Sequence, residues 1–365
     1  METLAIIINY KSAAHTLQAV QSVLSSESLG PVVVRVVDNS ESPAEADRLL
    51  AKLSPSVDLV VNAENEGFGR ACNRAAESWK GEAILLINPD ARILPGCLER
   101  LQKTLFSVQS AAAVSPQIFW DEQLEYYFPP PCSPALTELQ VFLQREEKNY
   151  VTRLLDAYWR NYVIRRWRAK MPVRVRNLSG GMALLKCACL PDADKLFDPR
   201  FFLYYEDMDL FLRLRKAGFD LLVEPRARAI HYYNQCAVAD VDRKRCLMHA
   251  SMALFWEKHR RILNKWPGRA LSYLLPSLKI KGRTVDHEFS HPFSMQMPAF
   301  LRREWLFEWS PNPDFIPSAG RFGSGRQFQF PHYCWEKLAT GRYYGRFGRP
   351  KAFERRFLRI SWVVA

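Results

Sequence analysis

Short aliphatic and β-branched runs alternate with segments of helical periodicity over about the first hundred residues. The apolar runs predict strands, and the segments with an apolar residue at every third or fourth position predict helices. The predicted strands cover 4–9, 32–39, 58–62 and 83–88, and the predicted helices cover 12–26, 44–53 and 69–80. Such alternation is typical of an α/β fold with a mostly parallel sheet.

Polar side chains follow each of the four predicted strands. They are Asn9 and Tyr10, Asp38 and Asn39, Asn62 and Asn65, and Asn88 to Asp90. In α/β sheets of this kind, ligands bind at the carboxyl ends of the strands. We therefore expect these side chains to share one edge of the sheet and to form a nucleotide pocket.

The pattern changes after Trp120, where a Pro-rich stretch leads into a long segment of helical periodicity that ends near Lys170. This segment is rich in arginine and carries Trp159 and Trp167. We interpret residues 121–172 as an insertion that ends in a basic amphipathic helix. Two interpretations stay open, a helix on a membrane surface and a solvated helix whose tryptophans pack inward.

The strand pattern resumes after the insertion. Residues 173–185 are expected to be strands, 197–218 a loop and a helix, 219–231 a strand pair and 251–263 a closing helix. We expect one domain over residues 1–265. Residues 266–365 form a basic, aromatic region to which the sequence assigns no role.

Charge divides the chain unevenly. The net charge of the 365 residues is +13, but residues 1–140 hold 10 Lys and Arg against 17 Asp and Glu, and the remainder holds 41 against 21. A basic surface of this size attracts nucleic acid, an anionic membrane or a phosphorylated substrate. No pattern of an established nucleic-acid-binding fold is present, so no nucleic acid is expected as partner.

Several other classes of protein are disfavoured. The eight cysteines include no C-x-x-C pair and no zinc spacing, so we expect mostly buried thiols in a reducing compartment. The N-terminus has neither the basic start nor the cleavage site of a signal peptide. No stretch reaches the roughly 18 apolar residues of a spanning helix. A cytoplasmic protein, either soluble or peripheral at the inner face of the membrane, is expected.

Asp90 is the first candidate for chemistry. Asn-Pro-Asp is by itself a common turn, but here the apolar run AILLI delivers the carboxylate to the edge of the sheet, and Pro89 fixes the turn. A divalent ion that bridges two phosphates needs only one or two protein carboxylates, because phosphates and waters supply the other ligands. Asp90 is therefore a candidate metal ligand.

The string NEGFGRACN follows the third strand. Gly67 and Gly69 permit a tight turn and close backbone approach ahead of a helix. Asn65 and Asn73 flank them as hydrogen-bonding groups. The string fits a donor pocket and fits equally the first turn of a helix.

The string YYEDMDLFLR supplies further carboxylates. At about 100° per residue, Glu206, Asp209 and Arg213 lie on nearly one side of a helix, and Asp209 with Arg213 makes an i,i+4 pair. Asp207 lies off that side, near the positive N-terminal end of the helix. Asp207 is thus the carboxylate available to accept a proton, although acidic residues at a helix start are also simple caps.

Together these strings resemble the family 2 glycosyltransferases of the GT-A fold, particularly their bacterial rhamnosyltransferase-like branch. The matching strings are IIINYKS, VVDNS, NEGFGRACN, LLINPDARI, LSGGMALL, FDPRFFLYYEDMDLFLRLRKAGF and ARAIHYY. The resemblance implies a Rossmann-like nucleotide-binding sheet within a mixed central sheet. Residues 266–365 match no part of it.

The resemblance also implies roles for single residues on the donor side. Asn9 and Asp38 would contact the nucleobase and ribose of a nucleotide-diphosphate sugar. The other implied donor-binding residues are Asn65, Gly67, Asn73, Asp90, Gly180 and Gly181.

For the reaction, the resemblance implies that Asp90 and His231 hold Mg²⁺ or Mn²⁺ and that Asp207 is the general base. One base opposite the leaving group implies inversion at the sugar. The acceptor would be a glycan or a lipid-linked molecule, with an anionic membrane surface as a further candidate partner. The alternative is a catalytically silent peripheral protein that binds glycans or membranes on the same fold.

Overall fold

The computed structural model describes residues 1–137, 150–190, 196–232, 241–259, 287–354 and 356–364. The chain divides into two compact units. Unit 1 comprises Met1–Ile118 and Lys170–Ile262, and unit 2 comprises Phe119–Ala169 and Leu263–Ala365. The sequence led us to expect an insertion at 121–172 and a separate region from 266 onward. In the structure, most of these two segments belong to the same unit.

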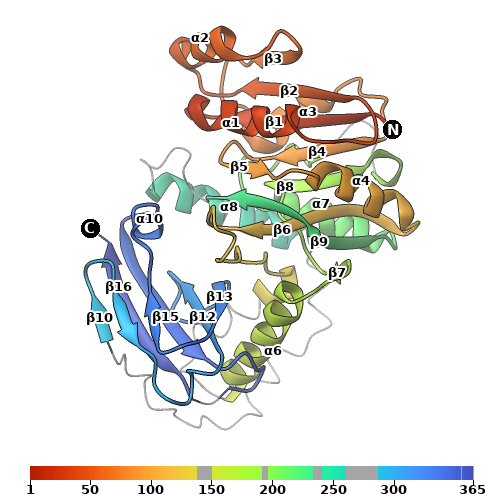
Figure 1. Ribbon diagram of the computed structural model, residues 1–365. Helices are drawn as coiled ribbons and strands as arrows, with labels where there is room; N and C mark the ends of the chain where they lie inside the picture. The colour runs from red at the N-terminus through yellow and green to blue at the C-terminus, as the bar shows by residue number, and fades with distance from the viewer. Residues whose placement is uncertain (138–149, 191–195, 233–240, 260–286, 355, 365) are drawn as a thin grey trace. The chain divides into compact units, whose positions relative to one another are not determined.

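Unit 1 is built on a mixed sheet that has nine strands in the described residues, with the order β3-β2-β1-β4-β8-β6-β9-β5 and β7 paired to β9 (Figure 1). The strands are β1 (Thr3–Asn9), β2 (Val32–Asp38), β3 (Val57–Val61), β4 (Ala83–Ile87), β5 (Ala91–Ile93), β6 (Ala111–Phe119), β7 (Val173–Val175), β8 (Met182–Lys186) and β9 (Asp220–His231). The first four strands pair in parallel, whereas β8 joins β4 in antiparallel fashion.

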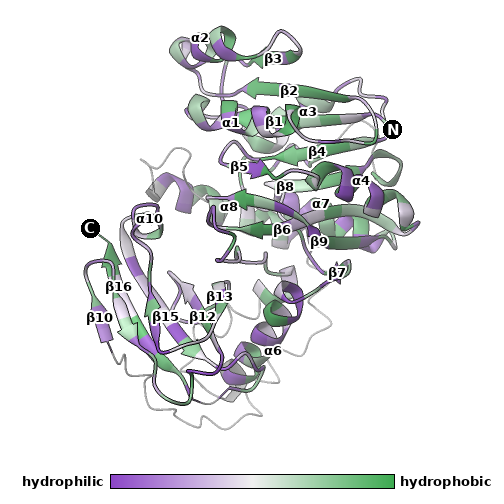
Figure 2. Cartoon of the chain, viewed as in Figure 1, coloured by the Kyte–Doolittle hydropathy of each residue, from purple (hydrophilic) through white to green (hydrophobic). Residues whose placement is uncertain are grey.

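Helices accompany this sheet along the chain. They are α1 (Ala13–Leu24), α2 (Pro43–Lys52), α3 (Phe68–Ala76), α4 (Cys97–Ser107), α7 (Glu206–Lys216) and α8 (Val241–His259). The strands β1 and β4 are buried along their whole length and are apolar in Figure 2, since helices and neighbouring strands cover a parallel sheet. The α/β class, the four N-terminal strands and the three helices predicted between them are confirmed.

One prediction in this unit is wrong. Residues 219–231 form the single strand β9 and not a strand pair. Its first part pairs with β7 and its last part with β5. Pro225 lies between these two paired stretches.

Unit 2 contains a five-stranded sheet, in the order β10-β16-β15-β12-β13, and the ribbon pair β11-β14. Its elements in the described residues are α6 (Tyr150–Trp167), β10 (His287–Phe289), β11 (Ser294–Gln296), β12 (Trp305–Ser310), β13 (Ala319–Gly323), β14 (Gln327–Gln329), α10 (His332–Trp335), β15 (Gly341–Gly348) and β16 (Leu358–Val364). Its core is mainly aromatic, with Phe307, Phe347 and Trp362 fully buried.

The α6 helix packs its tryptophans inward. Trp159 and Trp167 are buried in an apolar cluster with residues of the sheet. Of the two interpretations of this helix, the inward-packed tryptophans are the arrangement observed. Within the described residues, no helix is long and apolar enough to cross a membrane.

A buried ion cluster joins α6 to the sheet of unit 2. Arg160 Nε donates to Glu308 Oε2 at 2.7 Å, and Arg346 Nη2 donates to Glu308 Oε1 at 3.0 Å. Arg346 also pairs with Asp156 at 2.8 Å. Burial raises the pKa of Glu308, but the two guanidinium charges outweigh this effect and hold the pKa below its usual range.

Candidate active site

The predicted polar residues at the ends of β1 and β2 lie side by side. The parallel register pairs Asn9 with Asp38, and Asn9 Nδ2 donates to Asp38 Oδ1 at 2.8 Å. Asn9 Oδ1 accepts the hydroxyl hydrogen bond of Thr16 at 2.8 Å. Both Asn9 and Asp38 are buried. Asn9 therefore orients Asp38 and ties the end of β1 to α1.

Hydrogen bonds of two asparagine side chains hold the loop that precedes α3. Asn39 Nδ2 donates to Asn65 Oδ1 at 2.8 Å, and the Gly67 N–H donates to the same oxygen at 2.9 Å. Gly67 is the N-cap of α3 and has φ +82°. A Cβ at this position would lie 2.3 Å from the Phe202 carbonyl oxygen. This glycine thus permits close approach of the segment that leads to α7.

Asn73 fastens α3 to the same segment. Its Nδ2 donates to the Phe197 carbonyl at 2.8 Å, and its Oδ1 accepts from the Phe197 N–H at 2.9 Å. A side-chain amide that satisfies both backbone groups of one residue fixes the position of that residue. The structure therefore shows Asn73 as an anchor for the loop ahead of Asp207.

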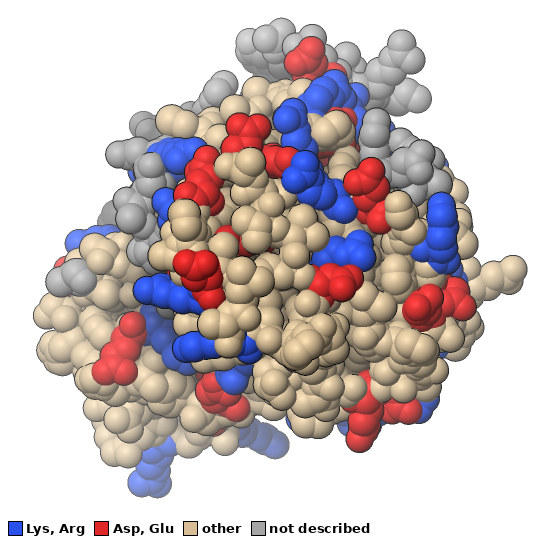
Figure 3. Space-filling view, turned by 90° about the horizontal axis from the view of Figure 1, so that it is seen from above, with Lys and Arg blue, Asp and Glu red and all other residues tan. Residues whose placement is uncertain are grey.

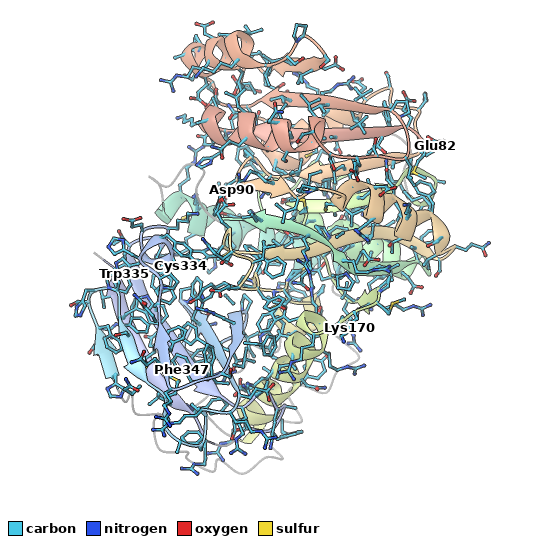
Figure 4. All side chains as sticks on the ribbon, in the orientation of Figure 1. Glu82, Asp90, Lys170, Cys334, Trp335 and Phe347 are labelled. Carbon is cyan, nitrogen blue, oxygen red and sulfur yellow. The ribbon has the colours of Figure 1, made fainter. Side chains whose placement is uncertain are left out.

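Asp90 and His231 form a buried pair at the edge of the sheet. They are brought together because β5 begins directly after Asp90 and pairs Ala91 with His231. Asp90 Oδ1 and His231 Nε2 are 3.0 Å apart, and both side chains are about 5% exposed. Figure 4 labels Asp90 beside β5. Depending on its tautomer, His231 either donates to Asp90 or presents a lone pair on the same side.

Gly180 and Gly181 lie between this pair and Asp207. The Gly180 N–H donates to Asp207 Oδ2 at 2.9 Å, and a Cβ on Gly180 would lie 2.9 Å from the Asp207 Cβ. A Cβ on Gly181 would lie 2.8 Å from Asn88 Nδ2 and 3.3 Å from His231 Cε1. The two glycines thus allow side chains on both sides to approach one backbone segment.

The carboxylates of Glu206 and Asp207 are not paired with a cation in the described part of the chain. Asp207 Oδ1 accepts the Met208 N–H at 2.7 Å, and its Oδ2 accepts the Gly180 N–H. Loss of hydration raises the pKa of Asp207, and these hydrogen bonds oppose only part of the rise. Glu206 is buried, and burial followed by the Asp207 charge raises its pKa.

The backbone ahead of these carboxylates is strained. Tyr204 and Tyr205 have φ +68° and +67°, a left-handed conformation that is unfavourable for bulky residues. Such conformations persist where surrounding contacts enforce them, often at functional sites. The strained pair sets the direction in which α7 begins, and thus the place of Asp207.

Asp209 has a different environment although it is only two residues away. The expected pair with Arg213 is confirmed at 2.8 Å, and His259 Nε2 and Lys258 Nζ lie 2.8 and 2.7 Å from Asp209 Oδ1. Burial raises the pKa of Asp209, but hydrogen bonds from His259 and Lys258 hold it below the usual range. Asp209 joins α7 to α8, and we assign it no chemistry.

The Asp90–His231 pair fits a divalent ion. Two neighbouring ligands of an octahedral ion at 2.0–2.1 Å are about 3 Å apart, and Asp90 Oδ1 and His231 Nε2 are separated by 3.0 Å. Within the described residues, no group of three or more His, Cys, Asp or Glu side chains could hold a metal alone. The pair is therefore suited to an ion that takes its remaining ligands from phosphates and water.

Near this centre, the sequence analysis counted Asn88 only as one of the strand-end polar residues and did not place Glu206 in the site. Asn88 donates its N–H to the Gly181 carbonyl at 2.8 Å and places its amide against the same glycine. Glu206 was assigned to the side of α7 that carries Asp209, but it is buried next to Asp207. The position of Asn88 directly after a strand was a usable signal, whereas the burial of Glu206 had none.

Comparisons with known proteins find glycosyltransferases. The family model described as Glycosyl transferase family 2 matches residues 4–166. The N-acetylglucosaminyl-diphospho-decaprenol L-rhamnosyltransferase of Mycobacterium tuberculosis, in strains CDC 1551 / Oshkosh and ATCC 25618 / H37Rv, is 26% identical over 243 residues, which cover 62% of this chain and 75% of the relative.

These matches support a glycosyltransferase enzyme that is similar to family 2. Its mixed α/β sheet is the GT-A arrangement that the resemblance implied. In this glycosyltransferase, Asp38 and Asp90 lie within the residues matched by the family model, and Gly180, Asp207 and His231 follow them along the chain.

Solved structures show a similar but distant match. A crystal structure of GalNAc-T7 with UDP, GalNAc and Mn²⁺ is similar to this glycosyltransferase with a TM-score of 0.43 and 16% identity. The match covers 63% of this chain and 44% of that chain.

Proposed function

We propose that this glycosyltransferase moves a sugar, with rhamnose as the first candidate, from a nucleotide diphosphate to a lipid-linked acceptor, with inversion at the anomeric carbon. The observation that carries the proposal is the position of Asp207 and of the Asp90–His231 pair on two sides of Gly180–Gly181. The rhamnosyltransferase and decaprenol in the name of the relative support the choice of sugar and acceptor.

On the donor side, Asp90 and His231 would hold a Mg²⁺ or Mn²⁺ ion. The bound ion would offset the negative charge that develops on the departing nucleotide diphosphate. Asp38, fixed by Asn9, is available to the nucleoside at the same edge of the sheet. Gly181 lets Asn88 and His231 approach the same backbone segment closely.

On the acceptor side, Asp207 would remove the proton of a hydroxyl group. As the proton passes to the carboxylate, the hydroxyl oxygen forms a bond to the anomeric carbon and the bond to the diphosphate breaks with its electron pair. The Gly180 and Met208 N–H groups orient the carboxylate for this task. A raised pKa makes Asp207 a stronger base than an exposed aspartate.

A donor screen tests the proposal. The full chain is heated with dTDP-rhamnose and other nucleotide sugars, with and without Mn²⁺ or Mg²⁺, because a ligand that binds the folded state raises the unfolding temperature. The stabilising donor is then incubated with an N-acetylglucosaminyl-diphospho-polyprenol, and the anomeric configuration of the product is read by NMR. We expect stabilisation that requires the metal, followed by transfer with inversion.

Variants make the screen specific. Asp90→Ala should lose the metal-dependent part of the stabilisation, whereas Asp58→Ala removes a half-exposed carboxylate that pairs with Arg35 and should behave as wild type. Transfer with retention would refute the single displacement. Metal-independent stabilisation by the donor, unchanged in Asp90→Ala, would refute the metal site.

A further inference from the structure

One end of the five-stranded sheet in unit 2 gathers basic loops. The register places Trp305 opposite Gly323, Leu306 opposite Gly348, and Phe347 opposite Leu358. The segments that meet at this end are residues 298–304, 324–326, 349–354 and 356–357, which we call the basic sheet end. Figure 4 labels Phe347, which lies one residue before β15 reaches this end.

The segments of the basic sheet end are tied to one another. The Gly325 N–H donates to the Arg302 carbonyl at 2.8 Å. Arg349 Nε donates to the Phe300 carbonyl at 3.1 Å, and the Arg356 guanidinium lies 4.4 Å from the Phe300 ring centroid. The loops therefore present their charges as one surface.

Six cationic side chains are exposed on this surface, namely Arg302, Arg303, Arg326, Arg349, Lys351 and Arg356. In the parts of the chain that the structure describes, none of the six forms an ion pair with a carboxylate. Of the nearby acids, Glu304 pairs with Arg168, which directly follows α6, and Glu354 Oε1 accepts the Arg356 N–H at 2.9 Å. The six cations are thus left to act on an external anion.

A large apolar side chain stands among these cations. Phe353 is 73% exposed, more than any other large hydrophobic residue among those described. It lies two residues from Lys351 and three from Arg356. An exposed aromatic ring close in sequence to exposed cations is the combination of side chains with which a segment enters the headgroup region of a membrane.

Two other surfaces, as far as the structure describes them, lack this combination. At the opposite end of the same sheet, residues 311–318 carry Asp314 and no Lys or Arg, and Arg342 is paired with Glu288. On the face shown in Figure 3, basic and acidic side chains are intermixed. The loop of residues 311–318 at the opposite end therefore lacks the positive charge that the basic sheet end carries.

We propose that the basic sheet end docks on an anionic phospholipid surface, with Phe353 inserted between headgroups and the six cations at the level of the lipid phosphates. Each Lys or Arg near such a surface strengthens binding roughly fivefold. Among the described residues at this end, the rings of Phe300, Phe322 and Phe357 are each faced by an arginine, so a row of open rings on which nucleic-acid bases could stack is not offered. The proposal does not depend on which sugar unit 1 transfers.

Vesicle co-sedimentation tests the proposal with the full chain. Wild type should bind vesicles of mixed phosphatidylglycerol and phosphatidylcholine at low salt and should dissociate from them at high salt. It should not bind vesicles of pure phosphatidylcholine. The triple variant Arg302→Gln, Arg303→Gln, Arg326→Gln should bind the anionic vesicles about 100-fold more weakly. Phe353→Ser should weaken binding about tenfold while leaving the charge unchanged.

A charge-matched control separates the surface from the total charge. The triple variant Lys80→Gln, Lys103→Gln, Arg342→Gln removes three exposed positive charges elsewhere and should bind as wild type does. Equal loss of binding in both triple variants would overturn the proposal, because net charge alone would then explain the attraction. It would also be overturned if wild type failed to bind anionic vesicles, or bound single-stranded poly(U) in preference to them.

Discussion

The two units each bury glutamate, but in opposite electrostatic settings. Glu308 in unit 2 is held by Arg160 and Arg346, and its pKa is below the usual range. Glu206 in unit 1 is buried beside Asp207, and the pKa values of both are raised. Burial acts in the same direction on Glu206 and Glu308, so the difference comes from their neighbours.

The charged groups next to each glutamate decide whether its carboxylate stays ionised. A buried carboxylate with two guanidinium partners stays charged and holds its surroundings in one arrangement, which suits a structural joint between α6 and the sheet. A carboxylate pair without cations is destabilised in its charged form and gains a proton readily, which suits general-base chemistry. Unit 1 also contains a buried carboxylate with cationic partners, Asp209, to which we assign a structural role.

The largest expected effect comes from removing the charge of Asp207. Asp207→Asn keeps the shape of the side chain but removes the proton acceptor, so we expect turnover to fall by about 10²–10⁴-fold. Metal-dependent donor binding should remain, because Asp90 and His231 are untouched. Initial rates with the donor found by thermal screening, beside the unfolding temperature with that donor, separate the two effects.

The matched control for this change is Asp209→Asn, two residues along the same helix. It should lower stability through the lost pairs with Lys258 and Arg213 and should leave turnover per folded molecule much closer to wild type. If Asp207→Asn retained near-normal turnover, Asp207 would not be the base.

A substitution in the Glu308 cluster should change the free energy of unfolding and not the turnover. Glu308→Gln leaves Arg160 and Arg346 buried without the charge they share, and removing one partner of such a cluster costs about 3–5 kcal/mol. Urea unfolding monitored by tryptophan fluorescence measures the loss. Glu304→Gln breaks an exposed pair with Arg168 and should change the free energy of unfolding by less than about 1 kcal/mol. Equal effects of the two substitutions would contradict the structural role of the cluster.

The glycine pair allows the two sides of the active site to be disturbed separately. Gly180→Ala would push against Asp207, and Gly181→Ala against Asn88 and His231. Displacement of a catalytic group by about 1 Å can cost 10²-fold, so Gly180→Ala should lower kcat by roughly that factor. Gly181→Ala should act mainly on the KM for the donor. Steady-state kinetics with each substrate varied in turn measure kcat and KM for both variants. If both variants changed kcat and KM in the same way, the two glycines would not act on separate sides of the site.

The sequence was sufficient for much of unit 1 and for its candidate centre. Long apolar runs with polar ends predicted β1, β2, β3 and β4, and Asp90 could be found because INPD follows such a run. Asp209 could be separated from Asp207 because helical spacing alone pairs it with Arg213. These are local signals, readable within a few residues of the chain.

The parts that could not be predicted depend on distant contacts. Gly180 meets Asp207 across 27 residues, and His259 meets Asp209 across 50. The left-handed backbone of Tyr204 and Tyr205 is enforced from outside, since neither residue favours it. In unit 2, β10, β11 and β14 have only three residues each and show no readable alternation, and the sequence analysis assigned no strand to residues 266–365.

The smallest expected effect is a change in pH dependence at Glu206. Because its pKa is raised in the folded state, the folded protein keeps a proton that the unfolded chain releases above about pH 4.3. Folded protein then binds more protons than unfolded protein, so the contribution of Glu206 to stability falls as the pH rises toward its native pKa. Glu308 has a lowered pKa, and its contribution is lost as the pH falls instead.

Glu206→Gln tests this opposition. The variant cannot release a proton, so its free energy of unfolding should decline less than that of wild type between mildly acidic and mildly alkaline pH. Urea unfolding at several pH values measures the two slopes. In Glu308→Gln, the free energy of unfolding should change less with pH on the acid side than it does in wild type. On the alkaline side, its pH dependence should equal that of wild type. A Glu206→Gln slope equal to that of wild type would mean that Glu206 is ionised in the folded protein, and the contrast between the two buried glutamates would then disappear.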